Sequence, residues 1–294
     1  MKDSVLNRRL FTSSVALSAL ALTTTASAQS PPKLAKKLGF VFGGGSARGF
    51  SHIGVLKALV EAGYHADVVV GTSAGALVGA FYAAGFTPWQ MEEVALRVRD
   101  IDVADFNSVN KRGMLAGEAL QKLVNDYTRQ QPIEKLKIPF GAVATNLLTG
   151  EPVLMRSGDT GLAVRASSAI PGVFVPTVVG GQELVDGGLV SPLPVRFART
   201  LGATHVIAID VGTKPQNNVA NGLYEVILQS FEIMGRSLTH LEAKEADVVI
   251  RPDTARFSST DFAARKDLIQ AGYTAGRSAV AELNKRIIPN GKPG

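Results

Sequence analysis

Residues 68–75 read Val-Val-Val-Gly-Thr-Ser-Ala-Gly, and the type of fold follows from this stretch. Its β-branched start predicts a buried strand, and the small residues from Ala74 to Ala84 predict a helix. Ser73 therefore lies on a sharp turn from strand to helix, where the flanking Gly71 and Gly75 permit a tight backbone. Such a turn exposes the serine hydroxyl, and the first amides of the following helix favour negative charge beside it. Ser73 is the predicted nucleophile.

A second glycine-rich loop lies upstream and reads Gly43-Gly44-Gly45-Ser46-Ala47-Arg48-Gly49. It follows an apolar run at 38–42, predicted to be a strand, and precedes a helical pattern at 47–62 that ends near Gly63. Two parallel strands joined by a crossover helix are the simplest topology for the unit. Adjacent strands would place the loop amides near the serine, so the loop is a predicted oxyanion hole with Gly44 and Gly45 as main donors.

The same loop has two other interpretations. A dinucleotide site would need an acidic residue at the end of the next strand, but that end carries Ser73, and Asp67 stands at the strand's beginning. The nucleotide interpretation therefore lacks a required part. Arg48 either pairs with a lipid phosphate or locks the loop through hydrogen bonds, and the sequence leaves both roles open.

A serine nucleophile needs a base, and Asp186 is the main candidate. It follows Leu184-Val185, the apolar end of a predicted strand at 182–185, and precedes Gly187 and Gly188, which let backbone and substrate come close. A free carboxyl group has a pKa of about 3.9, and burial would raise it toward the range useful for a base. The alternative is an aspartate that only orders a turn.

Four histidines offer a different base, and each also has a purely structural explanation. The order Ser73, Asp186 and then His205 or His240 imitates the triad of α/β-hydrolases. His52 lies in the first predicted helix and His65 in a short connection. A triad and a dyad of Ser73 and Asp186 therefore both remain candidates.

Helical and strand patterns alternate through the rest of the chain, with no repeat and no internal linker. Thr87-Pro88-Trp89-Gln90 is typical of a capping box that opens a helix. Further helices are predicted at 115–127, 161–168, 194–201, 221–245 and 266–286, strands at 138–144, 152–155, 205–211 and 248–251, and a hairpin at 173–185 that turns at Gly180-Gly181. One catalytic domain at 38–288 is expected, after a linker at 29–37 and before a frayed tail at 289–294.

The first 28 residues resemble a cleavable export signal of a bacterial protein. A basic start, a short apolar stretch and a final Ala26-Ser27-Ala28 match such a peptide. Arg8-Arg9 favours the twin-arginine route over the general secretory route, so contact with an export machinery and a periplasmic or secreted location are expected. Cleavage would reduce the formal charge from +6 to +4.

Composition limits the partners that the chain can have. It contains no Cys, which excludes disulfides and thiolate metal sites, and no basic stripe that would indicate nucleic acid binding. The modest positive charge either favours peripheral contact with anionic phospholipid surfaces or belongs to a solvated face.

Taken together, three motifs resemble the signatures of the patatin-like phospholipase family, in the same order and contexts. They are Gly-Gly-Gly-Ser-Ala-Arg-Gly at 43–49, Gly-Thr-Ser-Ala-Gly at 71–75 and Asp-Gly-Gly at 186–188, and the likeness covers roughly residues 38–215. One departure is Ser46, where many members carry a further glycine, although serine still offers its amide.

The resemblance implies a three-layer α/β/α fold with a mostly parallel sheet, and hydrolysis of lipid acyl esters without metal or other cofactor. It implies that Ser73 is the nucleophile, Asp186 its base and the loop from Gly43 to Gly45 the oxyanion hole. A non-catalytic lipid-binding protein of this fold and a lipid acyltransferase are the alternatives.

Overall fold

The computed structural model describes residues 36–108, 111–213 and 222–287. The predicted signal at 1–28 and the predicted tail at 289–294 lie outside the described residues, as does most of the predicted linker at 29–37. The described residues belong to one compact unit that begins at Lys36.

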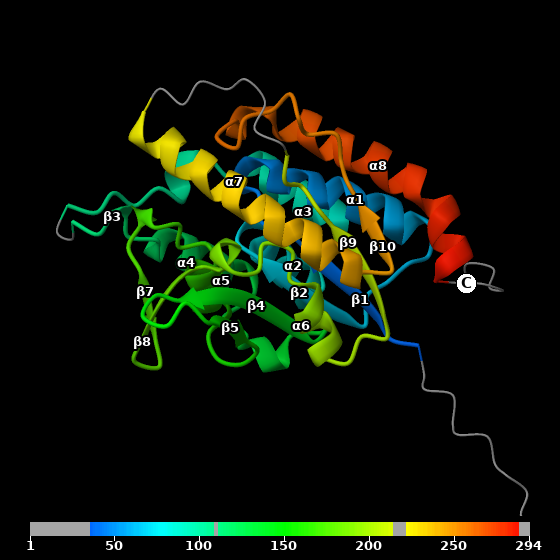
Figure 1. The fold of residues 1–294 in the computed structure, drawn as a ribbon, viewed down its shortest axis with the longest axis horizontal. Coiled ribbons are helices and arrows are strands. Elements are labelled where there is room, and N and C mark those ends of the chain that lie inside the picture. The colour runs from blue at the N-terminus through cyan, green and yellow to red at the C-terminus, as the bar shows by residue number, and fades with distance from the viewer. Residues whose placement is uncertain (1–35, 109–110, 214–221, 288–294) are drawn as a thin grey trace, which may run out of the picture. The chain divides into compact units, whose positions relative to one another are not determined.

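A mixed, mostly parallel sheet forms the centre of the described chain (Figure 1). Its strand order is β10-β9-β1-β2-β4-β8-β7, with β5 paired to β4 beside this path. The first five of these strands run parallel, whereas β5 and β8 run antiparallel to β4 and β7 runs antiparallel to β8. The strands are β1 (Leu38–Phe42), β2 (Val68–Thr72), β4 (Phe140–Asn146), β5 (Pro152–Met155), β7 (Thr177–Val179), β8 (Gln182–Asp186), β9 (His205–Ile209) and β10 (Val248–Ile250).

Helices cover both faces of this sheet. They are α1 (Phe50–Glu61), α2 (Ala74–Ala84), α3 (Pro88–Arg97), α4 (Glu118–Tyr127), α5 (Thr160–Ser167), α6 (Val195–Thr200), α7 (Leu223–Glu242) and α8 (Arg265–Arg286). The predicted capping box is present at the start of α3, where Thr87 and Gln90 exchange hydrogen bonds. The predicted three-layer α/β/α architecture is therefore confirmed.

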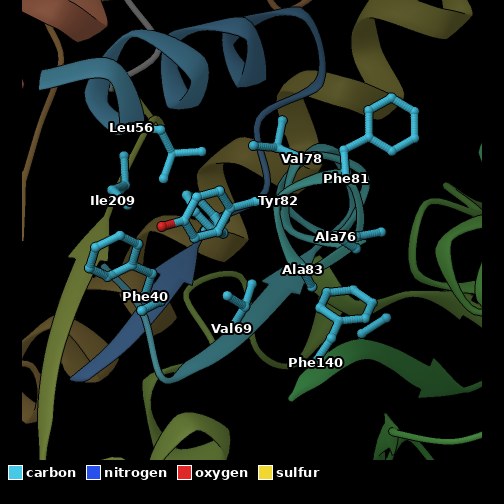
Figure 2. Packing of buried hydrophobic residues seen from close by; sticks show 14 of the residues in the cluster. Phe40, Leu56, Val69, Ala76, Val78, Phe81, Tyr82, Ala83, Phe140 and Ile209 are labelled. Atoms are coloured by element: carbon cyan, nitrogen blue, oxygen red, sulfur yellow. The ribbon is translucent and has the colours of Figure 1, made fainter. Parts of the chain in front are cut away.

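Alternate residues of the central strands point into two separate cores, as the twofold periodicity of a strand requires. Phe40 and Phe42 pack into the core under α1 and α2, whereas Val41 between them packs toward α6. Figure 2 shows the larger core, where Phe40, Val69 and Ile209 of the strands meet side chains of α1 and α2. The rings of Phe40 and Tyr82 stack there with centroids 6.0 Å apart.

Two predicted elements differ from the structure for a common reason. The predicted helix at 115–127 begins only at Glu118, and the first arm of the predicted hairpin at 173–179 is broken in two. The short strands β3 (Gly113–Leu115) and β6 (Gly172–Phe174) instead pair with each other in a separate two-stranded sheet. This pairing joins segments far apart in sequence, so local periodicity could not reveal it.

Helices α1 and α8 pack closely because each presents a glycine to the other. A Cβ on Gly54 would lie 1.8 Å from the carbonyl oxygen of Ile269, and one on Gly272 would lie 1.9 Å from that of Ser51. Any side chain at either position would force the helices apart.

We therefore expect Gly54→Ala to destabilise the fold by about 3 kcal/mol, because the overlap outweighs the gain of up to about 1 kcal/mol in helix propensity. The melting temperature should fall by about 5–10 °C in a thermal scan. Gly235→Ala in α7 is the matched control, since its Cβ would meet no atom closer than 3.7 Å. Equal melting temperatures for the two variants would contradict the packing argument.

Candidate active site

Ser73 occupies a strained turn between β2 and α2. Its φ is 54° and its ψ is −125°, a backbone conformation that non-glycine residues rarely adopt. The Ser73 amide donates to Ser167 Oγ at 2.9 Å, and that hydroxyl donates to the Val143 carbonyl at 2.5 Å. Ser73 is 7 % exposed, at the start of α2 where the helix dipole favours negative charge.

The glycines around Ser73 and Asp186 allow backbone segments to touch. A Cβ on Gly75 would lie 2.1 Å from the Phe42 carbonyl oxygen, and one on Gly187 would lie 2.1 Å from the Val143 carbonyl oxygen. The turn at Ser73 can therefore press against the glycine-rich loop only if position 75 has no side chain. Two other predicted glycines near the turn are equally confined. A Cβ on Gly49 would lie 2.6 Å from Ala74 Cβ, and one on Gly71 would lie 2.3 Å from the Gly75 carbonyl oxygen.

The strand register brings Asp186 beside Ser73. β5 pairs with β4 over residues 142–145 and so fills one edge of β4 there. β2 and β8 also pair within this stretch, so both must lie on the opposite edge, one after the other. Thr72 of β2 lies opposite Val143, and Asp186 of β8 lies opposite the next residue of β4. Ser73 follows Thr72 and therefore meets Asp186 where β2 ends.

Asp186 is buried and its carboxyl group has an unusual proton affinity. Burial raises its pKa from 3.8 to about 6, against the lowering effects of the Ser73 hydroxyl and of the Gly188 amide. Oδ1 accepts the Gly188 amide at 2.7 Å. Among the described residues, Oδ2 has no partner of good hydrogen-bond geometry, although the Ser73 hydroxyl is close enough to favour the ionised form. The Ser73 hydroxyl and the Asp186 carboxyl group thus lie close together without a well-formed hydrogen bond between them.

The glycine-rich loop differs in part from its predicted role. The Gly43 amide donates to the Ile209 carbonyl at 3.0 Å, and the Gly44 amide donates to the Pro192 carbonyl at 2.9 Å. Both amides are thus used by the fold, which is a correction to the expectation that Gly44 is a main donor to an oxyanion. In the described residues, the amides of Gly45 and Ser46 make no hydrogen bond. These two amides are the ones left to receive an anion.

His52 of α1 binds the backbone of this loop at Gly43. The buried ring donates from Nε2 to the Gly43 carbonyl at 2.8 Å, and Phe42 packs edge-on against it. Burial lowers the pKa of His52 to about 4, against the opposing effect of the Gly43 hydrogen bond, so the ring is neutral at pH 7. His52 therefore has a structural role and its ring is committed to the loop backbone.

Arg48 takes the structural role of the two that the sequence left open. The guanidinium is buried and donates to the Phe257 carbonyl at 3.0 Å and to Glu232 of α7 at 2.8 Å. The ion pair with Glu232 ties the end of the glycine-rich loop to α7. Arg48 is thus already paired, and Glu232 is neutralised by it.

The remaining histidines separate clearly by position. His205 begins β9 opposite Leu38, the first residue of β1, so it lies at the N-terminal ends of the parallel strands, whereas Ser73 follows the C-terminal end of β2. His65 is exposed in the connection before β2, also near the N-terminal ends of the parallel strands. His240 of α7 lines the same cavity as Ser73 and Asp186. Of the triad candidates, only His240 therefore lies near the pair.

Two cavities meet at Ser73. One has a volume of about 230 Å³ and is lined mainly by apolar side chains of α1, α2, α3 and α4. The other has a volume of about 490 Å³ and lies between Asp186 and the polar face of α7. Ser73, Ser46 and Ile170 line both. An ester whose carbonyl lies at this junction would extend one end into the apolar cavity and the other into the polar cavity.

Sequence patterns did not identify the contribution of α7. Its residues Glu232, Arg236 and His240 line the polar cavity at intervals of four, as one helix face requires. Glu242 accepts hydrogen bonds from the Ser191 hydroxyl and the Leu193 amide, and so holds the segment whose Pro192 carbonyl receives Gly44. Polar residues four positions apart were the one sequence feature that could have indicated this face of α7, but the same spacing is equally typical of a solvated helix face.

Within residues 36–108, 111–213 and 222–287, no cluster of His, Asp and Glu side chains is arranged to hold a metal ion. No helix in this part of the chain has the length and apolar content needed to cross a bilayer.

Comparisons with known proteins identify relatives of this chain. The chain is 38 % identical over 182 residues to an uncharacterized NTE family protein of Mycobacterium tuberculosis, covering 60 % of this chain and 49 % of the relative. It is 34 % identical over 230 residues to human patatin-like phospholipase domain-containing protein 6, covering 76 % of this chain and 16 % of that protein. The chain thus spans about half the length, or less, of these relatives.

Structural similarity extends to VipD from Legionella pneumophila, with a TM-score of 0.61 over 84 % of this chain and 67 % of that one. At 16 % sequence identity this likeness concerns the fold alone. The family model for the patatin-like phospholipase matches residues 40–199, which include the glycine-rich loop, Ser73 and Asp186. The chain therefore belongs to the patatin-like phospholipase family.

Proposed function

We propose that this protein is a serine hydrolase that cleaves acyl esters of lipids through a dyad of Ser73 and Asp186. The observation that carries the proposal is the strand register, which sets a buried carboxylate beside a serine held on a strained turn. A carboxylate with a pKa of about 6 is ionised at pH 7 and is a better proton acceptor than an ordinary aspartate. Membership of the family supports lipid esters as the class of substrate.

In the proposed reaction, Ser73 Oγ attacks the ester carbonyl and its proton passes to Asp186. The carbonyl oxygen becomes an anion that the amides of Gly45 and Ser46 stabilise, together with the dipole of α2. The tetrahedral species collapses, the alcohol leaves with the proton from Asp186, and an acyl-serine remains. Water, deprotonated by Asp186, then releases the fatty acid and restores the hydroxyl of Ser73.

The pKa of Asp186 makes a prediction about pH. The dyad requires the ionised carboxylate, and burial raises its pKa to about 6. The value of kcat/KM for a soluble acyl ester should therefore be level above about pH 7 and fall about tenfold per pH unit below 6. Initial rates across this range, at constant ionic strength, would check it. A fall that is centred elsewhere and disappears in His240→Ala would instead indicate a histidine base.

The alternatives within this fold are a non-catalytic lipid-binding protein and an acyltransferase. The first predicts lipid binding with no wild-type turnover of short acyl esters. The second predicts that an added alcohol, rather than water, receives most of the acyl group from Ser73. Product analysis by mass spectrometry, with and without glycerol as acceptor, separates the three activities.

A further inference from the structure

Three arginines line the polar cavity, and two of them are paired with acidic side chains. Arg48 pairs with Glu232, and Arg251 pairs with Asp210 at 3.0 Å. The remaining arginine, Arg236, has neither an ion pair nor a hydrogen bond within the described part of the chain. Of the described acids, one more lines this cavity, and it is Asp186, which the proposed reaction uses. Among the described residues, Arg236 is thus a cation with no protein partner at this cavity.

The position of Arg236 relative to Ser73 follows from the packing of α7. Gly235, the preceding residue, lies against the Gly188 carbonyl and Pro192, close enough that its Cβ would be 3.7–3.8 Å from them. This turn of α7 therefore sits directly on the segment that follows Asp186. One turn earlier on the same face, Glu232 is bound to Arg48 of the glycine-rich loop. These two contacts place Arg236, an exposed residue, on the side of α7 that lines the polar cavity.

The apolar cavity can hold the acyl chain of a lipid ester. Side chains such as Leu77, Met91 and Leu120 line it and offer an acyl chain apolar contacts. Its residues beside Ser73 are shared with the polar cavity, so a bound ester would extend from the junction into both. The acyl chain fits the apolar side, which leaves the alcohol side of the ester facing α7.

We propose that Arg236 determines specificity by binding an anionic phosphate carried on the alcohol side of the ester, while the acyl chain occupies the apolar cavity. Arginine suits this role because its planar guanidinium donates two parallel hydrogen bonds to phosphate oxygens. The inference rests on the proposed function, since it assigns the two ends of the substrate of that same site.

The test compares two soluble substrates with the same acyl chains, dihexanoyl phosphatidylglycerol and neutral dihexanoylglycerol, using the full chain. Arg236→Gln should lower kcat/KM for the phosphate ester about 10- to 100-fold and leave the neutral ester within about twofold of wild type. Arg236→Lys should recover part of the loss. Arg277→Gln is the matched control, since Arg277 is an exposed helical arginine that lines neither cavity.

Several outcomes would overturn the assignment. Equal losses on both substrates would mean that Arg236 supports the fold or the chemistry, and no loss on either would mean that it does not touch the phosphate. Inorganic phosphate that inhibits both substrates alike, through Arg236, would mean that the cavity binds free phosphate instead. Absence of wild-type turnover on both substrates would be a failure of the proposed hydrolase function itself.

Discussion

Alanine in place of Ser73 should lower kcat/KM for a soluble acyl ester by at least about 10⁴-fold. The substitution removes only the hydroxyl oxygen, so no acyl-serine can form. The oxyanion amides and both cavities remain, and they account for the residual rate. Stability should change little, because the Ser73 hydroxyl has no strong partner beyond its loose contact with Asp186. Initial rates and a thermal scan on the same preparation measure the two effects.

A fluorophosphonate probe gives an independent measurement of the same residue. Wild-type protein should be labelled at Ser73 and the Ser73→Ala variant should not be. Ser278→Ala is the control, since this serine lies on the exposed side of α8 and its hydroxyl donates a hydrogen bond to the Thr274 carbonyl of the same helix. Labelling that persists in Ser73→Ala, or wild-type protein that remains unlabelled where a known serine hydrolase reacts, would refute the proposed nucleophile.

Asparagine in place of Asp186 should lower kcat by roughly 10³-fold, because the base is lost while its shape is kept. The amide oxygen of asparagine can still accept the Gly188 hydrogen bond that Oδ1 accepts at 2.7 Å. The backbone around Ser73 should thus stay in place and KM should change much less than kcat. The fall in rate below pH 6 should also disappear, since it reports this carboxyl group.

His240→Ala is the comparison that separates a dyad from a triad. His240 lines the polar cavity, but in the described residues it makes no hydrogen bond to Ser73 or Asp186. Its replacement should therefore leave kcat within a few-fold of wild type. If His240→Ala instead matched the loss in Asp186→Asn, histidine would be the base and Asp186 its orienting partner.

Local patterns predicted most elements of the fold because each element has its own periodicity. The bounds of β1, α2 and β5 agree with their predicted ranges, since each is a run of apolar or small residues, and a glycine follows β1 and α2 directly. β3 and β6 were missed because three residues carry almost no periodic signal and their pairing is non-local. The same limit applies to the site. Ser73 and Asp186 lie in local motifs, whereas the walls of the two cavities come from separate helices, among them α7 for the polar cavity and α1 to α4 for the apolar one.

The sequence by itself determined that Ser73 stands on a strand-to-helix turn and that Asp186 ends a strand, because glycines and β-branched residues act on their immediate neighbours. Only the tertiary structure decided that β8 pairs with β4 directly beyond the end of β2, which brings Asp186 beside Ser73. It also decided that the carbonyls of Ile209 and Pro192 accept hydrogen bonds from the amides of Gly43 and Gly44. The contacts of Gly43 and Gly44 join residues more than a hundred positions apart, and Asp186 pairs with Ala144 across about forty. Pairing across such distances depends on how all strands and helices pack together, and no local stretch of sequence encodes it.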